Sequence, residues 1–216
     1  MSEEMYIVGG TKPWNWEHFR KRLLPMRGKW FYFSDPVELK THVLLHQPRF
    51  VFFLHWPWKV PDEVLGAAEC VCFHMTDLPY GRGGSPLQNL ISRGAKETKL
   101  SAIQMTQELD AGPIYTKSTL SLEGTAEQIY IRVSAEACAI IRDMTQDTGL
   151  PKLSPHPQTG RPVTFKRRTP AESEMPSRYG DQLYHHIRML DAETYPRAFI
   201  DHGDYRIEFS RAALYL

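Results

Sequence analysis

Hydrophobic positions in the first half of the chain alternate between short continuous runs and helical spacing. The continuous runs predict buried strands at residues 5–8, 30–33, 49–55 and 69–75. Between them, apolar side chains recur with the period of a helix at residues 14–24, 36–46 and 62–68. Continuous apolar strands joined by helices are typical of a parallel sheet covered on both faces. The pattern therefore predicts the α/β class, with an open, mostly parallel, Rossmann-like sheet and helices on both faces.

The second half contains fewer alternations and then changes in composition. We expect a glycine-rich loop at residues 80–84 and strands at residues 100–105 and 114–122. Helices are expected at residues 86–91, 125–148 and 182–190. Prolines recur from residue 151 onwards, which favours an extended linker, and residues 198–214 read as a hairpin. We therefore predict a catalytic domain over residues 1–150. Residues 151–216 are predicted to be a linker and a small C-terminal α+β appendage that packs on that domain, because they are too few to bury a core alone.

Composition narrows the class of protein. The chain has 216 residues, 42 % hydrophobic and 24 % charged, which excludes a disordered or coiled-coil chain. Its net charge of +1 gives no global field for nucleic acid or a membrane, and neither is an expected partner. No apolar run reaches the roughly 18 residues of a membrane span, and the N-terminus does not resemble a signal peptide. We therefore expect a cytoplasmic protein.

Cysteine and histidine residues were considered first as metal ligands. Cys70, Cys72 and His74 alternate along one predicted strand and have no fourth ligand nearby, whereas closed zinc sites need four. We therefore predict no metal site, with reduced thiols packed in the core. His74 is different, because it ends a predicted strand just before the glycine-rich loop. In open α/β sheets, ligands bind at that edge, although position alone leaves a structural role open.

Two motifs around His74 resemble one enzyme family. Residues 74–86 read His-Met-Thr-Asp-Leu-Pro-Tyr-Gly-Arg-Gly-Gly-Ser-Pro, which resembles the H-x-S-L-L-P-x-x-R-G-x-x-P signature of folate-dependent formyltransferases. Residues 109–114, Leu-Asp-Ala-Gly-Pro-Ile, resemble the family's L-D-x-G-x-I element. His74 and Asp110 lie 36 residues apart, as in the family layout, and the resemblance covers roughly residues 48–150.

The resemblance implies a donor, a reaction and a set of site residues. The donor would be 10-formyltetrahydrofolate, with His74 as general base and Asp110 orienting it. Cys72 takes the place of the family's asparagine, whose amide helps hold the formyl oxygen, and a thiol is a weak donor. The implied pterin contacts are His55, Trp56, Pro57, Trp58, Thr106, Gln107 and Leu109.

The predicted acceptor rests on the tail of the chain. Residues 165–170 and 184–199 resemble the sugar N-formyltransferases, most closely the type found in the pseudaminic acid pathway. This resemblance implies a nucleotide-linked amino sugar, in particular a UDP-sugar, as acceptor. The residues expected to bind it are Arg82, Gln88, Asn89, Lys166, Arg167 and Arg168. A tRNA acceptor is disfavoured by the neutral charge and short tail. The tail also allows a homodimer, which the sequence does not decide.

Two other functions remain open at this point. The chain would be a folate-binding protein with impaired catalysis if Cys72 abolishes turnover. It would be a formyl-tetrahydrofolate hydrolase if the same His74 and Asp110 activate water. The retained histidine and aspartate argue against the first alternative. The extended tail argues against the second, because a hydrolase needs no acceptor platform.

Overall fold

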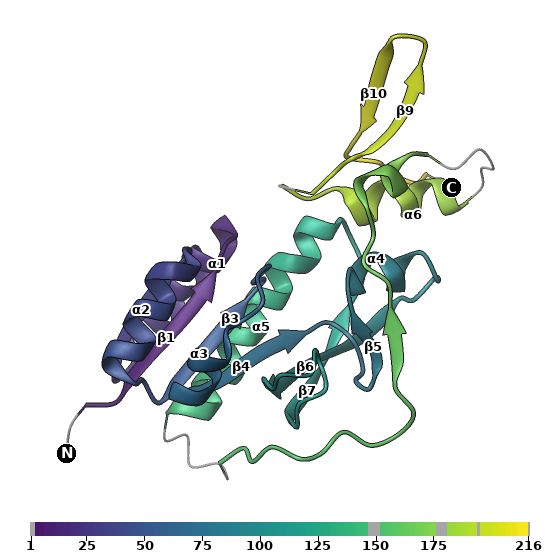
Figure 1. Ribbon diagram of the computed structural model, residues 1–216. Coiled ribbons are helices and arrows are strands. Elements are labelled where there is room, and N and C mark those ends of the chain that lie inside the picture. The colour runs from purple at the N-terminus through teal and green to yellow at the C-terminus, as the bar shows by residue number, and fades with distance from the viewer. Residues whose placement is uncertain (1–2, 147–151, 176–180, 194, 216) are drawn as a thin grey trace.

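Six strands form one sheet in a computed structural model of the chain, which describes residues 3–146, 152–175, 181–193 and 195–215 (Figure 1). Their order across the sheet is β2-β1-β3-β4-β6-β7. The bounds are β1 (Met5–Gly10), β2 (Lys29–Phe33), β3 (Phe50–Leu54), β4 (Glu69–His74), β6 (Glu97–Gln104) and β7 (Ile114–Ser121). The first four strands pair in parallel, and β6 and β7 continue the sheet antiparallel. The prediction of an open, mostly parallel α/β sheet is confirmed.

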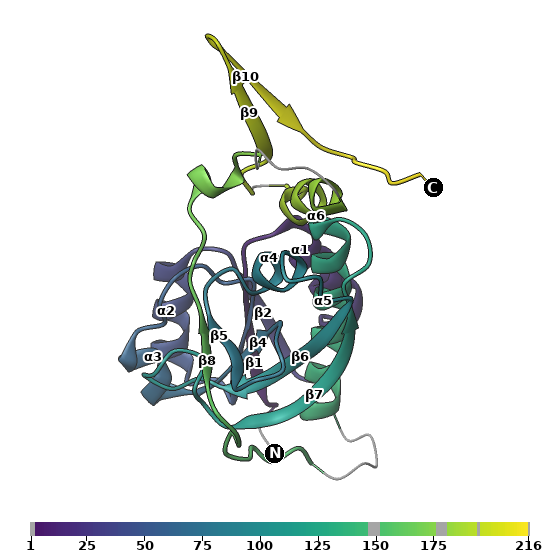
Figure 2. The same ribbon diagram turned by 90° about the vertical axis from the view of Figure 1, so that its right-hand side faces the viewer.

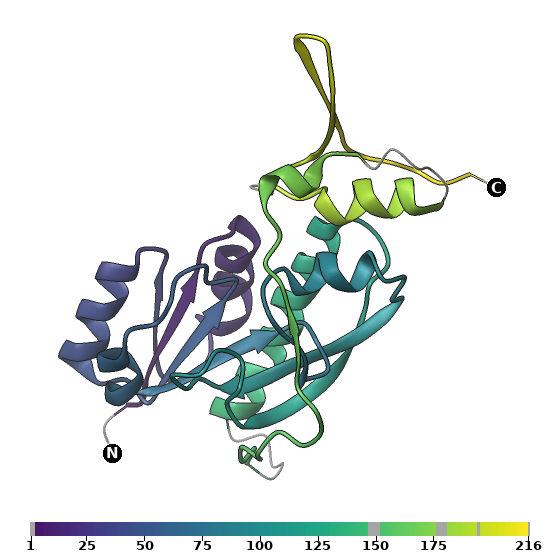
Figure 3. The same ribbon diagram turned by 45° about the vertical axis from the view of Figure 1, so that its right-hand side comes forward.

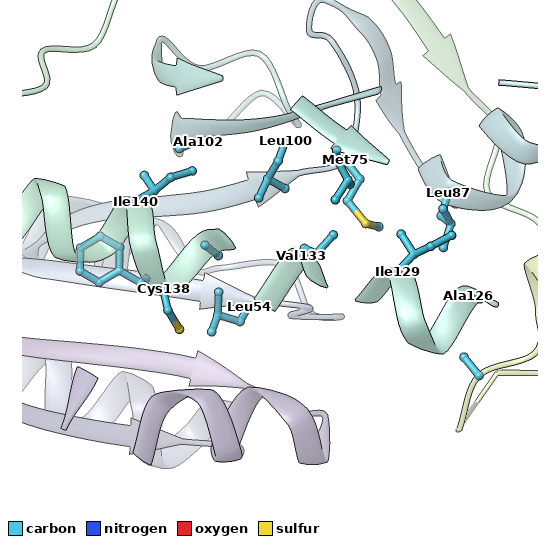
Figure 4. Packing of buried hydrophobic residues seen from close by; sticks show 14 of the residues in the cluster. Leu54, Met75, Leu87, Leu100, Ala102, Ala126, Ile129, Val133, Cys138 and Ile140 are labelled. Atoms are coloured by element: carbon cyan, nitrogen blue, oxygen red, sulfur yellow. The ribbon is translucent and has the colours of Figure 1, made fainter. Parts of the chain in front are cut away.

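Helices cover both faces of the sheet, as predicted (Figure 2). On one face, α2 (Pro36–His46) and α3 (Asp62–Ala67) contribute Leu39, Val43 and Val64 to a core with β1 and β3. On the other face lies the 20-residue helix α5 (Ala126–Thr145), whose buried side chains pack in a core with residues of the sheet. Figure 4 shows Val133 and other α5 side chains packed among residues of the sheet. Burial on both sides explains why the central strands are apolar throughout.

Polar residues fix where two of these helices begin. Asp35 Oδ1 accepts hydrogen bonds from the backbone N–H groups of Val37 and Glu38, both at 2.9 Å. Thr125 Oγ1 accepts from Gln128 N, and the Gln128 side chain accepts in return from Thr125 N. These caps satisfy backbone donors that the first helical turn leaves unpaired.

The predicted helix over residues 14–24 is interrupted. It consists of α1 (Pro13–His18) followed directly by the π-helical turn η1 (Phe19–Leu23). The wider turn shifts the buried face, so Phe19 and Leu23 are buried while Trp16 is exposed. We expected buried positions to keep the 3.6-residue spacing of an α-helix up to residue 24, and this prediction is wrong after residue 18.

The predicted glycine-rich loop contains a strand. Residues Tyr80–Gly83 form β5, which pairs in parallel with β8 (Val163–Phe165) of the predicted linker. Gly81 and Gly83 adopt positive φ angles of 79° and 98°, so the segment lacks the side-chain alternation of an ordinary strand. The linker therefore returns across the carboxyl edge of the sheet.

The C-terminal elements lie beyond that edge. They lie on the side of the sheet where α4 (Pro86–Ile91) also lies. These elements are η2 (Pro170–Ser173), α6 (Asp181–Leu190), β9 (Ala198–His202) and β10 (Tyr205–Phe209). Arg188 of α6 is buried and donates to the carbonyls of Leu122 and Gly124, which joins α6 to the turn before α5. The β9–β10 hairpin projects away from the sheet (Figure 3). Within the described residues, no helix has the length and apolar character needed to cross a bilayer.

Candidate active site

A cavity of about 640 Å³ lies at the carboxyl ends of β3 and β4. Its walls come from the segment after β3, the end of β4 and the turn between β6 and β7. In parallel α/β sheets this edge collects loops from several strands, and ligands bind there. The structure brings most of the sequence-predicted site to this cavity. The predicted residues that line it are His55, Trp56, Pro57, Trp58, Cys72, His74, Thr106, Gln107, Leu109, Asp110 and Arg167.

The imidazole of His74 is held in one tautomer. The residue is 8 % exposed, and its Nε2 lies 2.7 Å from the Gly81 carbonyl oxygen. A carbonyl only accepts hydrogen bonds, so Nε2 carries the proton and the neutral ring has its lone pair on Nδ1. That atom lies 3.5 Å from Asp110 Oδ1. Nδ1 is therefore the basic atom of the site, and the imidazolium formed by protonation would pair with the Asp110 carboxylate.

Asp110 is oriented by a backbone N–H group of β5. Its Oδ2 accepts a hydrogen bond of 2.9 Å from Gly83 N, which leaves Oδ1 towards His74. Its own backbone has a positive φ of 53°, a conformation that aspartate tolerates better than most residues. The loop also depends on Gly112, because a Cβ there would lie only 1.7 Å from the Gln104 carbonyl oxygen. The glycine of the second motif thus has a steric role.

Cys72 lies two residues before His74 on β4 and is partly exposed. Burial, and then the negative charge of Asp110, raise the pKa of the Cys72 thiol well above its ordinary value. The group is therefore neutral at physiological pH, and a thiol donates only weak hydrogen bonds. It is a weaker hydrogen-bond donor than the asparagine amide that the resemblance implies at this position.

Slow alkylation is the expected result of that raised pKa. At pH 8, we expect iodoacetamide to modify Cys72 in the folded protein more than about tenfold slower than in the unfolded protein, because only the thiolate reacts. The modification rate should still be rising at pH 10. Peptide mass spectrometry after timed quenching measures each thiol separately, with buried Cys138 as the internal comparison. A modification rate for Cys72 that levels off below pH 9 would contradict a raised pKa of its thiol.

His55 is a second histidine in the cavity wall, and it is neutral. Asn15 Nδ2 lies 3.1 Å from His55 Nδ1 and can only donate, so Nδ1 accepts. Burial, with a smaller effect from the charge of Lys12, lowers the pKa of His55 to about 3. The ring packs edge-on against Tyr130, 4.9 Å away between centroids. His55 therefore does not exchange protons near neutral pH.

The walls on the side predicted to bind the pterin are aromatic. The rings of Trp56 and Trp58 meet edge to face at 4.9 Å, and Trp58 is 45 % exposed. Opposite them, Gln107 Nε2 donates to Asp62 Oδ2 and Thr106 Oγ1 donates to the Glu108 carbonyl. Flat apolar surfaces with a few polar groups are typical of small-molecule sites.

Residues predicted to bind the acceptor are dispersed. Arg167 lines the cavity, whereas Lys166 is exposed outside it and Arg168 donates to the Glu172 carbonyl. Gln88 is 1 % exposed, and its amide donates to Tyr130 and to the Met189 carbonyl.

Asn89 and Arg82 are also engaged within the protein. The Asn89 side chain bonds to backbone carbonyls of the neighbouring loops. Arg82 bonds to Gln158 and Glu108 and does not line the cavity. The structure thus places Gln88, Asn89 and Arg82 in structural contacts.

Sequence reasoning missed the groups that position His74 and Asp110. The Gly81 carbonyl and the Gly83 N–H are backbone atoms, so they leave no side-chain signature beyond the glycines themselves. Gln158, which bonds to the Asp110 loop, lies in the predicted linker, where no motif marks it. Across the residues that the structure describes, no cluster of His, Cys, Asp and Glu is arranged to hold a metal ion.

Several known proteins similar to this chain are named as formyltransferases. A family model described as the C-terminal domain of methionyl-tRNA formyltransferase matches residues 170–215. A curated methionyl-tRNA formyltransferase from Bacillus mycoides is 28 % identical over 155 residues, which is 69 % of this chain and 49 % of that protein. The chain thus spans about half the length of the curated relatives it matches.

Solved structures give a longer match. A methionyl-tRNA formyltransferase from Clostridium thermocellum is 41 % identical, with a TM-score of 0.91, over 98 % of this chain and 94 % of that one. A sugar N-formyltransferase from a Shewanella species covers 99 % of both chains at a TM-score of 0.72. Its identity is only 14 %, so that likeness concerns the fold alone.

These comparisons contradict the predicted acceptor. The chain is similar at substantial identity to proteins named for methionyl-tRNA, and only distantly similar to sugar enzymes. The predictions of a nucleotide-linked amino sugar, of the pseudaminic acid pathway and of no nucleic-acid partner are therefore wrong. The error came from interpreting residues 165–170 and 184–199 as typical of sugar enzymes, whereas residues 170–215 match the methionyl-tRNA formyltransferase model.

The broader resemblance was correct. Both linked motifs lie at one cavity, on a fold shared with formyltransferases, and the Clostridium thermocellum protein is 41 % identical over nearly the whole chain. The chain belongs to the folate-dependent formyltransferase family.

Proposed function

We propose that this chain transfers a formyl group from 10-formyltetrahydrofolate to the α-amino group of methionyl-tRNA. The observation that supports this most strongly is the pair formed by His74 Nδ1 and Asp110 Oδ1, 3.5 Å apart at the cavity. An amine attacks only in its neutral form and must lose a proton as it becomes an amide. His74 Nδ1 is a base of suitable type for that proton, and the imidazolium can return it to N10 of the donor as the bond between N10 and the formyl carbon breaks.

The residues of the chain have distinct tasks in this reaction. The Gly81 carbonyl keeps the His74 proton on Nε2, so that Nδ1 can accept another. Asp110 then balances the positive charge on the imidazolium, as carboxylates do beside catalytic histidines. The Gly83 N–H holds the second oxygen of Asp110 and so fixes which one faces the ring.

The cavity suits the proposed formyl donor. Its volume of about 640 Å³ lies within the range of small-molecule sites, and Trp56 and Trp58 offer flat surfaces for a ring system. When bound, 10-formyltetrahydrofolate supplies the activated formyl group. The protein residues bind and orient it, and apolar walls such as Leu65 and Val133 limit the access of water.

A methionyl-tRNA acceptor is supported by the relatives and by cationic side chains at the cavity and on the C-terminal segment. The 41 % identical protein is named for that substrate, and residues 170–215 match the corresponding C-terminal domain model. Arg167 lines the cavity, and Arg197 is exposed on the segment before β9. Guanidinium groups bind phosphates, so such residues can contact an RNA backbone despite a net charge of only +1.

The test is a formylation assay on purified protein. Methionyl-tRNA and 10-formyltetrahydrofolate are incubated with the chain, and the aminoacyl group is released and weighed by mass spectrometry. We expect formylmethionine with the wild type and formation about a thousandfold slower with His74→Gln. Free methionine and uncharged tRNA serve as acceptor controls. Formate release without acceptor would indicate a hydrolase instead, and folate binding without either product would indicate an inactive binding protein.

A further inference from the structure

Gln158, on the segment after α5, joins two parts of the candidate site. Its Nε2 donates to the Asp110 carbonyl at 2.8 Å and to the Gly112 carbonyl at 2.9 Å. Its Oε1 accepts from Arg82 Nε at 3.1 Å and from Arg82 Nη2 at 2.8 Å. All hydrogen-bonding positions of the amide are therefore used. The partners also fix its orientation, because carbonyls only accept and a guanidinium only donates.

The backbone on either side of Gln158 is anchored. His156 forms two hydrogen bonds with Ile114 at the start of β7, N to O at 2.9 Å and O to N at 2.8 Å. On the other side, Val163 N donates to the Pro79 carbonyl, and β8 pairs with β5. Gln158 thus lies between two fixed points, and its side chain is held against the turn that contains Asp110.

The turn containing Asp110 needs an external support. Asp110 is in the left-handed region, with φ of 53°, which non-glycine residues seldom adopt. Gln158 bonds to the carbonyl of Asp110 itself and to the carbonyl two residues later, so it restrains the backbone on both sides of Ala111. The direction of the Asp110 carboxylate depends on that backbone.

The Gln158 amide also supports the strand that holds His74, the other member of the His74–Asp110 pair. Arg82 belongs to β5, between the two glycines whose backbone groups bind His74 and Asp110. Arg82 also bonds to Glu108 at 3.2 Å. Through Gln158 and Arg82, the strand that fixes the His74 tautomer is joined to the turn that presents Asp110.

We propose that Gln158 is a positioning residue, which holds the Asp110 carboxylate opposite His74 Nδ1. This inference rests on the proposed formyl transfer, because it assigns to Gln158 the alignment of the base and its carboxylate. Gln158 does not line the cavity and touches neither of the two side chains directly. It acts through the backbone of residues 110–112 and through Arg82.

Residues 104–106, next to the predicted contacts of the formyl donor, are held by hydrogen bonds that do not involve Gln158. Gln104 N donates to the Pro113 carbonyl at 2.9 Å, and Met105 N donates to the Cys70 carbonyl at 2.8 Å. Loss of the Gln158 bonds should therefore move Asp110 and leave residues 104–106 in place. This arrangement predicts a large fall in kcat with little change in KM for the formyl donor.

Two substitutions separate the bonds of Gln158. Gln158→Met keeps the length of the side chain and removes both sets of hydrogen bonds. Gln158→Glu keeps an acceptor for Arg82 but sets a carboxylate against the two carbonyls. We expect kcat to fall about 10- to 100-fold in both variants, as a small misplacement of reacting groups does, with donor KM changed less than about threefold. Thr159→Ala, at an exposed neighbour, is the matched control and should equal the wild type.

A second measurement needs no turnover. Hydrogen–deuterium exchange at the Gly83 amide reports whether Asp110 Oδ2 still accepts its proton. We expect faster exchange in Gln158→Met than in Thr159→Ala. A wild-type exchange rate in Gln158→Met would overturn the positioning role, as would wild-type kcat in either Gln158 variant. If the wild type itself transfers no formyl group, the proposed function fails, and the Gly83 amide still decides whether Gln158 positions Asp110.

Discussion

His74→Gln should lower kcat for formyl transfer by about a thousandfold, within the range of loss of a general base. Glutamine can still donate to the Gly81 carbonyl, so the local hydrogen bond and much of the side-chain volume are retained. What is lost is the basic lone pair that faces Asp110 at 3.5 Å. The proton leaving the acceptor amine then has no imidazole to accept it.

The measurement is single-turnover formyl transfer at saturating donor, with thermal unfolding of each variant as a check on folding. His46→Gln, at the exposed end of α2, is the matched control and should retain full activity. Donor affinity should change little, since the cavity walls at Trp56 and Trp58 are untouched. A loss of less than about tenfold would exclude His74 as the general base.

Gly112→Ala is expected to disable the site by a different route. The new methyl group would lie 1.7 Å from the Gln104 carbonyl oxygen and 2.9 Å from its carbon, and both are backbone atoms of the adjoining strand. Neither can rotate away, so the turn between β6 and β7 must open. We expect the free energy of unfolding to fall by about 3 kcal/mol, the upper range for overpacking, together with most of the activity.

Gly66→Ala provides the control for this substitution. Nothing lies within 4 Å of a Cβ at Gly66, and the residue is in helix α3, where alanine is favoured over glycine. Chemical denaturation should show Gly66→Ala equal to or slightly more stable than the wild type. If Gly112→Ala unfolds at the same denaturant concentration and keeps its activity, the turn is more adaptable than the contact with Gln104 implies.

Much of the fold could be predicted because burial dictates the pattern of these strands. Residues 50–54 are apolar without interruption, and the structure buries them between helices on both faces. The start of α2 could be predicted equally well, because an aspartate followed by a proline, as at Asp35, is typical of a helix N-terminus. By contrast, β5 and β8 could not be predicted. Their pairing joins residues about 80 positions apart, and two glycines with positive φ remove the usual alternation.

In the candidate site, too, some groups could be predicted from the sequence and others could not. His74 and Asp110 stand in two linked motifs, so their side chains were predicted to act together, and the structure sets them 3.5 Å apart. The groups that orient them are backbone atoms or, for Gln158, a lone amide in a proline-rich segment. The neutral charge wrongly counted against a tRNA acceptor, because net charge is a sum over the whole surface. A total of +1 does not report where individual arginines lie.

The pairing of β5 with β8 has a consequence for the order in which the protein matures during synthesis. All six strands of the large sheet, and helix α5, are complete by residue 145, whereas β8 begins at Val163. Domains fold as units while the ribosome is still adding residues, and the N-terminal part comes first. A nascent chain can therefore assemble its sheet while the loop that binds His74 still lacks its partner strand. The pairing of β5 with β8, next to the Gly81 carbonyl that contacts His74, can form only after the segment beyond α5 has emerged.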